Sequence, residues 1–425
     1  MSYPTTLDSI RVNHPAPPHV PGDRIVDLSW AQGYIPNNLV DPYEPFHWLT
    51  GADIPSLLYA PPVPGVLAAA AGGSNEGSWA VTHYDDIKRV YTDNEHFSNR
   101  GTAEFQRLVG ETFRSIPLAI DPPEHGSYRR FLMPHFSPSK LNALEAGMRA
   151  VVVEMMQGFS NTGEVDVAYD FGRIYPVRIF MALMGFPPPM LEQFLAWVWD
   201  ILHSGSEESM AGAMRNVLEY LRSFMKEKEA HPDEHLVSQI VNGRIDGRPL
   251  TDDEKIGTVW FLWLGGLDTV AATISQMFRR MALQPDIQRT LQAKPELISG
   301  AVEEFLRTQP ILSSQRRATK DFEWHGATIK QGESVLCLNC AGNFDPAYFR
   351  NPRDFDPTRK GNYHFTFVGG VHLCLGAPLA RRELRILLEE WFKRIPEFRV
   401  RDGADTTVFP GLLSIRNLPL VWDVS

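Results

Sequence analysis

The stretch Phe367-Val-Gly-Gly370-Val-His372-Leu-Cys374-Leu-Gly376 decides the fold of this 425-residue chain. Adjacent glycines allow a tight turn, and the last long helix, predicted over residues 375–394, begins directly after Cys374. Backbone N–H groups and the helix dipole at such a position favour a thiolate. Gly376 has no side chain, so a flat macrocycle can approach the backbone closely. A thiolate held in this way can push electron density onto a bound iron and favour cleavage of the O–O bond.

A ten-residue pattern distinguishes Cys374 from an ordinary cysteine. A lone cysteine is more often a small buried residue than a ligand. Here Phe-x-x-Gly-x-His-x-Cys-x-Gly resembles the haem-binding loop of the cytochromes P450, and it departs from the family at Val368, where a glycine is usual. The resemblance implies a cytochrome P450 fold, mainly α with a minor β part, in which one large helical domain encloses haem b. It implies that Cys374 is the axial ligand of the iron and that Phe367, Gly370 and Gly376 shape the loop around the cofactor.

Length, composition and charge describe a single globule. Hydrophobic residues make up 43% and charged residues 22%, and no linker, repeat or low-complexity segment marks a boundary, so residues 1–425 are predicted to form one domain with residues 1–24 as an extended arm. A net charge of −10 argues against nucleic acid as a partner. No apolar run approaches the roughly 20 residues of a membrane helix, no signal peptide is apparent, and three cysteines cannot form a disulfide framework. We expect a cytoplasmic protein with no membrane partner.

Hydrophobic periodicity predicts a mainly helical protein. Short strands are expected at 79–82, 323–329 and 334–338, and a helix at 83–92 is expected to be capped by Asp85 or Asp86. The other helices are predicted at 138–159, 176–185, 189–203, 207–229, 234–242, 252–283, 285–293, 295–308 and 375–394.

The predicted helix 252–283 is the most informative of these. Thr251 and Glu254 have the spacing of a capping box. Residues 256–267 are apolar nearly all round, which indicates a buried helix, and the whole helix would span ~50 Å at ~1.5 Å per residue. Gly265 and Gly266 each cost roughly 1 kcal/mol relative to alanine inside a helix. The glycines therefore indicate either close helix packing or a local opening of the helix.

The two polar residues after these glycines have two interpretations. Asp268 and Thr269 could be satisfied core residues, or they could act on dioxygen. The resemblance implies the second: Thr269 hydrogen-bonds dioxygen during its reduction, and Asp268 gates the delivery of protons that O–O cleavage needs. Because a buried carboxylate needs a partner, the resemblance also makes Arg178 the expected partner of Asp268.

Three further groups of residues match the family. Glu304 and Arg307 form a Glu-x-x-Arg pair expected to bind Arg359 of Phe355-Asp-Pro-Thr-Arg359 and to hold the underside of the haem site. Arginine and histidine donors should converge on the two haem propionates. The expected propionate anchors are His125, Arg129, Arg316 and His372. A basic patch that could steer an acidic [2Fe–2S] ferredoxin, fed by a separate NAD(P)H-dependent reductase, is expected at Arg129, Lys360, Arg381 and Arg382.

The resemblance extends over most of the chain and is closest to the bacterial camphor-hydroxylase group, through stretches such as Gly110-Glu-Thr-Phe113 and Leu418-Pro-Leu-Val-Trp-Asp423. In that group a tyrosine hydroxyl orients the camphor ketone, whereas the matching Phe113 has no such donor, which argues against camphor. We expect a small hydrophobic substrate, terpenoid or norisoprenoid-like, that is hydroxylated with O2. The implied pocket walls are Phe113, Phe261, Leu264, Leu312, Leu412 and Leu413.

Two other functions compete with this interpretation. A haem peroxygenase would use peroxide, although such an enzyme needs no dedicated proton relay like Asp268 and Thr269. Cys337-Leu-Asn-Cys340 has the spacing of a redox or metal motif, so a zinc-binding protein without catalytic activity could use Cys337, Cys340, His372 and Cys374.

Overall fold

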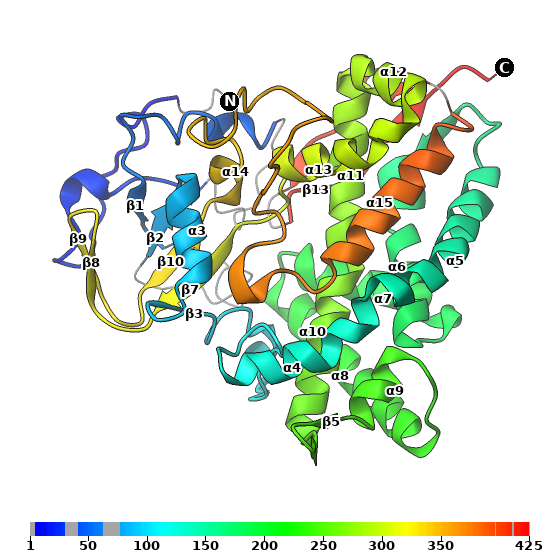
Figure 1. Ribbon diagram of the computed structural model, residues 1–425, viewed down its shortest axis with the longest axis horizontal. Coiled ribbons are helices and arrows are strands. Elements are labelled where there is room, and N and C mark those ends of the chain that lie inside the picture. The colour runs from blue at the N-terminus through cyan, green and yellow to red at the C-terminus, as the bar shows by residue number, and fades with distance from the viewer. Residues whose placement is uncertain (1–4, 30–40, 63–76, 396, 410–411, 425) are drawn as a thin grey trace.

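The computed structural model describes residues 5–29, 41–62, 77–395, 397–409 and 412–424. A large group of helices lies beside a smaller part built from strands (Figure 1). The α-helices are α3 (Tyr84–Thr92), α4 (Glu124–Leu132), α5 (Pro138–Gln157), α6 (Tyr175–Met184), α7 (Leu191–Leu202), α8 (Glu207–Ala230), α9 (Leu236–Val241), α10 (Asp252–Leu267), α11 (Thr269–Leu283), α12 (Pro285–Ala293), α13 (Ile298–Thr308), α14 (Asn339–Gly342) and α15 (Ala377–Trp391).

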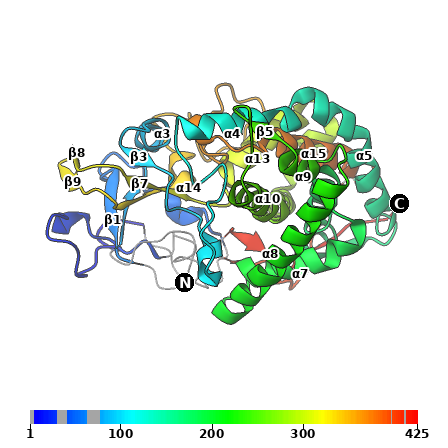
Figure 2. The same cartoon turned by 90° about the horizontal axis from the view of Figure 1, so that it is seen from below.

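Helices α10 and α11 form the central rod of the helical part, and Figure 2 looks along α10 with α8 and α9 beside it. The predicted capping box is confirmed: Glu254 N–H donates to Thr251 Oγ1 over 3.3 Å, and Thr251 N–H donates to Glu254 Oε2 over 2.7 Å. The predicted helix 252–283 is interrupted at Asp268, which separates α10 from α11. Within the described ranges, this stretch alone is long and apolar enough to cross a membrane, and it is mostly buried inside the fold, as a core helix is.

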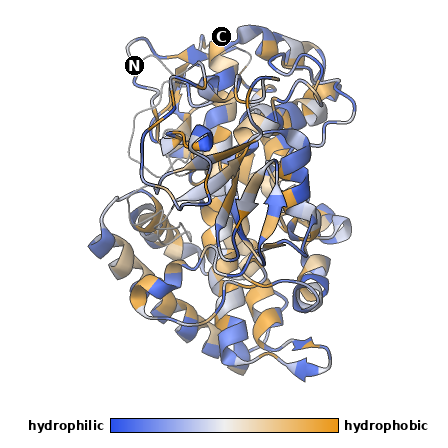
Figure 3. Cartoon of the chain, turned by 90° about the vertical axis from the view of Figure 1, so that its left-hand side faces the viewer, coloured by the Kyte–Doolittle hydropathy of each residue, from blue (hydrophilic) through white to orange (hydrophobic). Residues whose placement is uncertain are grey.

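The main sheet has five strands in the order β1-β2-β10-β7-β3, where β10 is parallel to β2 and the other neighbours are antiparallel. Every residue of β1, β2 and β10 is buried, and Figure 3 shows apolar residues on these strands. The strands are β1 (Leu57–Ala60), β2 (Ser78–Val81), β3 (Phe97–Ser98), β4 (Glu164–Asp166), β5 (Arg244–Ile245), β6 (Arg248–Pro249), β7 (Ser314–Ala318), β8 (Phe322–Trp324), β9 (Ala327–Ile329), β10 (Ser334–Cys337), β11 (Arg399–Val400), β12 (Val408–Phe409), β13 (Ser414–Ile415) and β14 (Pro419–Val421).

Two local predictions are wrong. The stretch 323–329 is a hairpin of β8 and β9 rather than one strand, because His325 and Gly326 both have positive φ and turn the chain. Helix α3 is not capped by an aspartate of its own first turn; instead Asp345 accepts a hydrogen bond from the N–H of Tyr84 over 2.8 Å. This cap comes from a residue more than 250 positions later in the chain, so local sequence could not predict it.

The predicted arm at residues 1–24 is docked onto the body, and its first four residues lie outside the described ranges. Ile10 is 3% exposed and packs into the larger core, while Val20 packs into the core of the sheet. The ring of His19 lies 2.8 Å from Glu333, between β9 and β10. The arm therefore contributes to the packing of both parts of the molecule.

Candidate active site

A cavity of about 440 Å³ lies between the α10–α11 rod, the loop before α15, and the sheet. Most of the side chains that line it are apolar. The predicted site residues that line this one cavity are Cys374, Phe367, Gly376, His125, Arg129, Arg316, His372, Thr269, Phe261, Leu264, Leu312 and Leu412.

The cysteine loop has the tight geometry that its glycines predicted. Gly370 has a φ of 65°, and a Cβ there would lie 2.0 Å from the backbone oxygen of Tyr91, so only glycine fits. Val368, the departure from the family pattern, has a φ of 56°, a left-handed conformation in which glycine is unstrained. The loop closes through a hydrogen bond from Cys374 N–H to the Phe367 carbonyl over 3.0 Å. Valine therefore occupies a backbone conformation that glycine adopts more easily.

The sulfur of Cys374 borders the cavity, which is why this residue is exposed. Burial within the fold raises the pKa of its thiol, whereas the N–H groups of Gly376 and Ala377 and the charge of Arg129 act to lower it. The backbone N–H groups at the start of the helix therefore favour the thiolate form of Cys374, as predicted. The effect of burial on this pKa is the larger one.

Four basic side chains meet at one side of the cavity. The rings of His125 and His372 are 4.3 Å apart, and Arg129 and Arg316 also line the cavity. Burial and these neighbouring positive charges lower the pKa of His372 to about 3. His372 Nε2 and Arg316 Nη2 are buried and have no hydrogen-bond partner among the described residues. Buried donors without acceptors fit an anionic group such as a haem propionate, because each unpaired donor would otherwise cost about 1–3 kcal/mol.

The glycines in the central rod serve two different purposes. A Cβ on Gly266 would lie 2.4 Å from the Phe180 ring, so this glycine permits close packing against α6. A Cβ on Gly265 would meet nothing within 4 Å, and Gly265 lines the cavity. Thr269 lines it too, and its hydroxyl donates to the Gly265 carbonyl over 3.0 Å. Gly266 lines the cavity as well, so both glycines border it, and only Gly266 is also required by close packing.

The predicted partner of Asp268 is wrong. Arg178 forms a two-pronged ion pair with Glu154, at 3.0 and 2.9 Å, because its place on α6 puts it beside α5. Asp268 Oδ2 instead lies 2.9 Å from Nε2 of His203, the residue that follows α7. The sequence offered no periodic or motif signal for His203.

The Glu304 network has the predicted members. Arg307 donates to both carboxylate oxygens of Glu304, at 2.8 and 2.9 Å, and Arg359 donates to Oε1 at 3.0 Å. The backbone N–H of Asp356 and the side chain of Asn362 donate at 2.9 Å each. Burial acts to raise the pKa of Glu304, but these donors hold it below its ordinary value. Both Glu304 and Arg307 are fully buried.

Two of the predicted pocket residues do not line the cavity. Phe113 is 4% exposed and packs in the core, close to Gly257 of α10. Leu413 is also buried, and its carbonyl accepts a hydrogen bond from Gln276. Because Phe113 does not line the cavity, its lack of a hydroxyl is no evidence against camphor as a substrate. Wall residues that sequence reasoning missed are Phe105, Pro117, Leu118, Phe136, Phe180, Leu202, Val270 and Ile311.

Glu383 is a further lining residue that the sequence did not single out, since it follows two arginines in a stretch that looks like a solvated helix face. It is 1% exposed, and its Oε2 has no partner among the described residues. Burial raises its pKa well above the ordinary value and so favours the neutral carboxyl.

The predicted basic patch is only partly available. Arg381 donates to Glu303 at 2.6 and 3.0 Å, and Arg382 donates to Asn142 at 2.6 Å and lies 3.4 Å from Glu145. Their charges are therefore largely compensated within the protein. Lys360 is exposed, and Arg129 faces the cavity.

The zinc-binding alternative is wrong. Cys337 and Cys340 are completely buried, and burial raises the pKa of Cys337 to about 12, so both remain thiols. Within the described ranges, no group of three or more histidine, cysteine or acidic residues could hold a metal ion.

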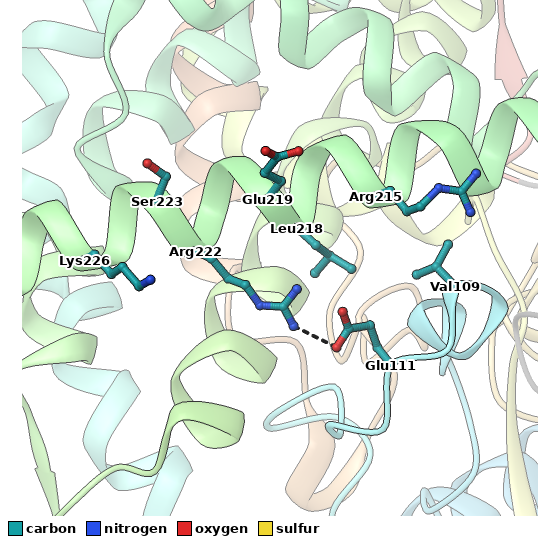
Figure 4. A pocket seen from close by; sticks show the side chains of 8 residues that line it. All are labelled: Val109, Glu111, Arg215, Leu218, Glu219, Arg222, Ser223 and Lys226. Atoms are coloured by element: carbon teal, nitrogen blue, oxygen red, sulfur yellow. Dashed lines mark hydrogen bonds and ion pairs between the residues drawn. The ribbon is translucent and has the colours of Figure 1, made fainter.

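A second hollow, of about 400 Å³, lies between α8 and the loop that carries Glu111, where Arg222 and Glu111 pair at 2.7 Å (Figure 4). It contains none of the predicted site residues.

Comparison with known proteins agrees with this site. The cytochrome P450 family profile matches residues 177–407. The chain is 33% identical to the probable cytochrome P450 127A1 of Sinorhizobium fredii over 96% of its length and 97% of that protein, and 31% identical to the mycinamicin IV hydroxylase/epoxidase of Micromonospora griseorubida over 82% and 90%. The crystal structure of CYP101J2 superposes with a TM-score of 0.82 at 30% identity, covering 97% of this chain and all of that one; CYP101C1 gives 0.80 at 30%, covering 96% and 99%.

The chain therefore belongs to the cytochrome P450 family. The predicted fold class, mainly α with a minor β part around haem, is confirmed, and so is the resemblance stated from the sequence. The protein is an oxidoreductase of the monooxygenase kind, and its cofactor is haem b.

Proposed function

We propose that this protein hydroxylates a small hydrophobic substrate, with Cys374 as the axial ligand of the haem iron. The observation that carries the proposal is that Cys374, Thr269 and the cluster of four basic side chains all border one largely apolar cavity. When bound, haem supplies the reduction of dioxygen and the transfer of one oxygen atom to a C–H bond.

The chain's own residues have separate tasks in this proposal. His125, Arg129, Arg316 and His372 would bind the propionates, which gives the unpaired atoms Arg316 Nη2 and His372 Nε2 an acceptor. Thr269 would hold a hydrogen-bonding hydroxyl over the reaction site, since its hydroxyl is already in the cavity wall beside Gly265. Asp268, directly before it, would take up and pass on protons.

The wall of the cavity supports an apolar substrate. Phe261 and Leu264 lie on α10 and Leu312 lies in the segment between α13 and β7, and Leu412 and Phe180 add to the same surface. We assign a terpenoid or norisoprenoid-like compound as the substrate. Such a molecule is compact and mostly hydrocarbon, so it would lose little hydration free energy when it leaves water for the cavity. Few polar groups are available to hold it, so its orientation would depend on shape.

We assign electron supply to a [2Fe–2S] ferredoxin with a separate NAD(P)H-dependent reductase in the cytoplasm. Exposed Lys360, close in sequence to the cysteine loop, could attract an acidic partner. Because the charges of Arg381 and Arg382 are paired with Glu303 and Glu145, the patch attracts an acidic partner less strongly than its number of basic residues suggests.

Spectroscopy of the haem-loaded protein tests the proposal. The ferrous carbonyl form should have the strongly red-shifted absorption of a thiolate ligand, and Cys374→Ala should lose it while Cys337→Ala keeps it. Terpenoids and norisoprenoids should then be screened for a shift of the ferric spin state. Turnover that depends on NAD(P)H, ferredoxin and dioxygen supports a monooxygenase, whereas turnover with hydrogen peroxide alone would make the protein a peroxygenase. A Cys374→Ala spectrum identical to the wild type would refute the ligand assignment.

A further inference from the structure

His203 holds the carboxylate of Asp268 at the break in the central rod. Its Nε2 lies 2.9 Å from Asp268 Oδ2, and the two side chains are 9% and 16% exposed. Asp268 is the N-cap residue of α11, yet its side chain makes no capping hydrogen bond. An aspartate in this position usually accepts from the first backbone N–H groups of its helix. Here the carboxylate binds the imidazole instead, which indicates that the pair is more than a helix cap.

His203 lies between the protein surface and the cavity wall. It follows the last residue of α7, and its backbone N–H donates to the Trp199 carbonyl over 2.8 Å. The Trp199 ring, 40% exposed, lies against the imidazole with centroids 4.9 Å apart. Arg416 covers Trp199 with its guanidinium carbon 4.9 Å from the ring centre. The neighbouring residue Leu202 lines the cavity.

The chemistry of this pair differs from that of an arginine–carboxylate pair. Burial acts to lower the pKa of His203, but the charge and hydrogen bond of Asp268 raise it. The end of α7, where carbonyl groups carry partial negative charge, also favours an imidazolium. Arginine does not release protons in a protein, whereas histidine does so close to neutral pH. The other ring nitrogen, Nδ1, has no hydrogen-bond partner among the described residues, and the side chain is 9% exposed, which gives solvent access to the ring.

We propose that His203 is the residue that positions Asp268 and supplies it with protons from solvent. In the ion pair the imidazolium carries a hydrogen on each nitrogen. Transfer of the Nε2 hydrogen to Oδ2 breaks one N–H bond, forms one O–H bond and leaves a neutral acid beside a neutral imidazole. The remaining ring hydrogen is then on Nδ1, and the bare nitrogen is Nε2. Once Asp268 has passed its proton on, the ring turns its Nε2 to solvent, takes a proton from hydronium, which leaves water, and turns back to form the ion pair again. The inference rests on the proposed function, because it gives a source for the protons that Asp268 passes on.

Matched variants of the haem-loaded protein test the relay. His203→Gln keeps a hydrogen-bond donor, and His203→Arg keeps a positive charge, but neither side chain can relay protons. Both should lower the yield of product per NAD(P)H consumed at least ~10-fold with the natural type of redox partner. Both should leave the peroxide-driven yield unchanged, because hydrogen peroxide brings its own protons with its oxygen. Arg178→Gln, which breaks the partly exposed pair with Glu154, is the control and should match the wild type.

A second measurement does not depend on turnover. In the diamagnetic ferrous carbonyl form, the nuclear magnetic resonance titration of the His203 ring should have its midpoint lowered by Asp268→Asn and unaltered by Arg178→Gln. Wild-type product yields in both His203→Gln and His203→Arg would overturn the inference. If Asp268→Asn also matched the wild type in yield, the proposed role of Asp268 would fail; if it alone lost yield, only the relay would fail.

Discussion

Two carboxylates of this fold, Glu304 in α13 and Asp268 between α10 and α11, differ in how many groups hold them. Glu304 accepts hydrogen bonds from two guanidinium groups, one amide side chain and one backbone N–H, and it has no exposed surface. Among the residues that the structure describes, the carboxylate of Asp268 has one side-chain partner, the titratable ring of His203, and it keeps some exposure. A carboxylate with many fixed donors cannot move or change charge without a large loss of free energy. One with a single imidazole can do both, so the comparison separates a structural site from a site suited to proton transfer.

Removing Glu304 should have the largest effect on stability. Glu304→Ala leaves Arg307 and Arg359 without their common anion, and breaking a buried pair in this way costs about 3–5 kcal/mol. With an unfolding entropy of ~2.1 cal/mol/K per residue, the melting temperature should fall by about 3–6 °C. Thermal unfolding followed by circular dichroism measures the shift. Glu154→Ala, in a partly exposed pair, is the control and should melt like the wild type. Equal melting of both variants would remove the contrast drawn above.

Removing the charge of Asp268 should affect catalysis rather than stability. Asp268→Asn should slow ferredoxin-driven product formation about 100-fold, equivalent to ~2.7 kcal/mol, because the amide cannot pass on protons. Its melting temperature should stay close to that of the wild type, since one hydrogen bond to His203 is exchanged for another. Rates of product formation and of NAD(P)H oxidation, measured together, check this. A variant that was strongly destabilised yet fully active would reverse the roles assigned to the two carboxylates.

Alanine variants of the two glycines before Asp268 test which of them is needed for packing of the central rod. Gly266→Ala should cost about 1–3 kcal/mol, because its Cβ would lie 2.4 Å from the Phe180 ring. Gly265→Ala should be neutral or stabilising by up to ~1 kcal/mol, since nothing lies within 4 Å and alanine is the better helix former. Thermal melting of the pair gives the comparison directly. Similar losses in both variants would contradict the separate purposes assigned to the glycines.

The smallest effect is a difference in pH dependence between the two carboxylate sites. The pKa of Glu304 is lowered by folding, so its contribution to stability is present above the unfolded value of ~4.3 and is lost as the pH falls through the folded pKa. The pKa of His203 is raised, so its contribution is complete below ~6.5 and is lost as the pH rises through the folded pKa. The loss of melting temperature caused by Glu304→Gln should therefore shrink as the pH falls, whereas the loss caused by His203→Gln should shrink as the pH rises. Parallel curves would count against both assignments.

The sequence predicted the features that depend on local residues. Helix α12 was predicted to the residue, and the capping box of α10 and the Glu304 network have the expected members. Each of these is encoded by spacing within a helix or by a motif of a few positions. Such patterns carry their physical meaning wherever the segment lies in space.

The features that escaped prediction depend on contacts between distant segments. Asp345 caps α3, and His203 replaces Arg178 as the partner of Asp268, although neither has a spacing that identifies it. Phe113 was assigned to the cavity wall by its match to the family, but the side chain turns into the core beside α10. Side-chain direction is set by tertiary packing, and a position in a sequence does not determine it. For the same reason the burial of Glu383 could not be predicted, because it results from the packing of α15 against the rest of the fold.

The cluster of basic side chains has a consequence for assembly of the holoprotein. Its members come from α4, from β7 and from the loop before α15, and the guanidinium groups of Arg129 on α4 and Arg316 on β7 bring like charges together around one space. Their mutual repulsion opposes folding until an anion is present, and a ligand that binds only the folded chain stabilises it in proportion to its affinity. The cofactor should therefore join the sheet to the helices. In the haem-free chain, hydrogen exchange and proteolytic cleavage should begin along the boundary between these two parts, before the helices themselves open.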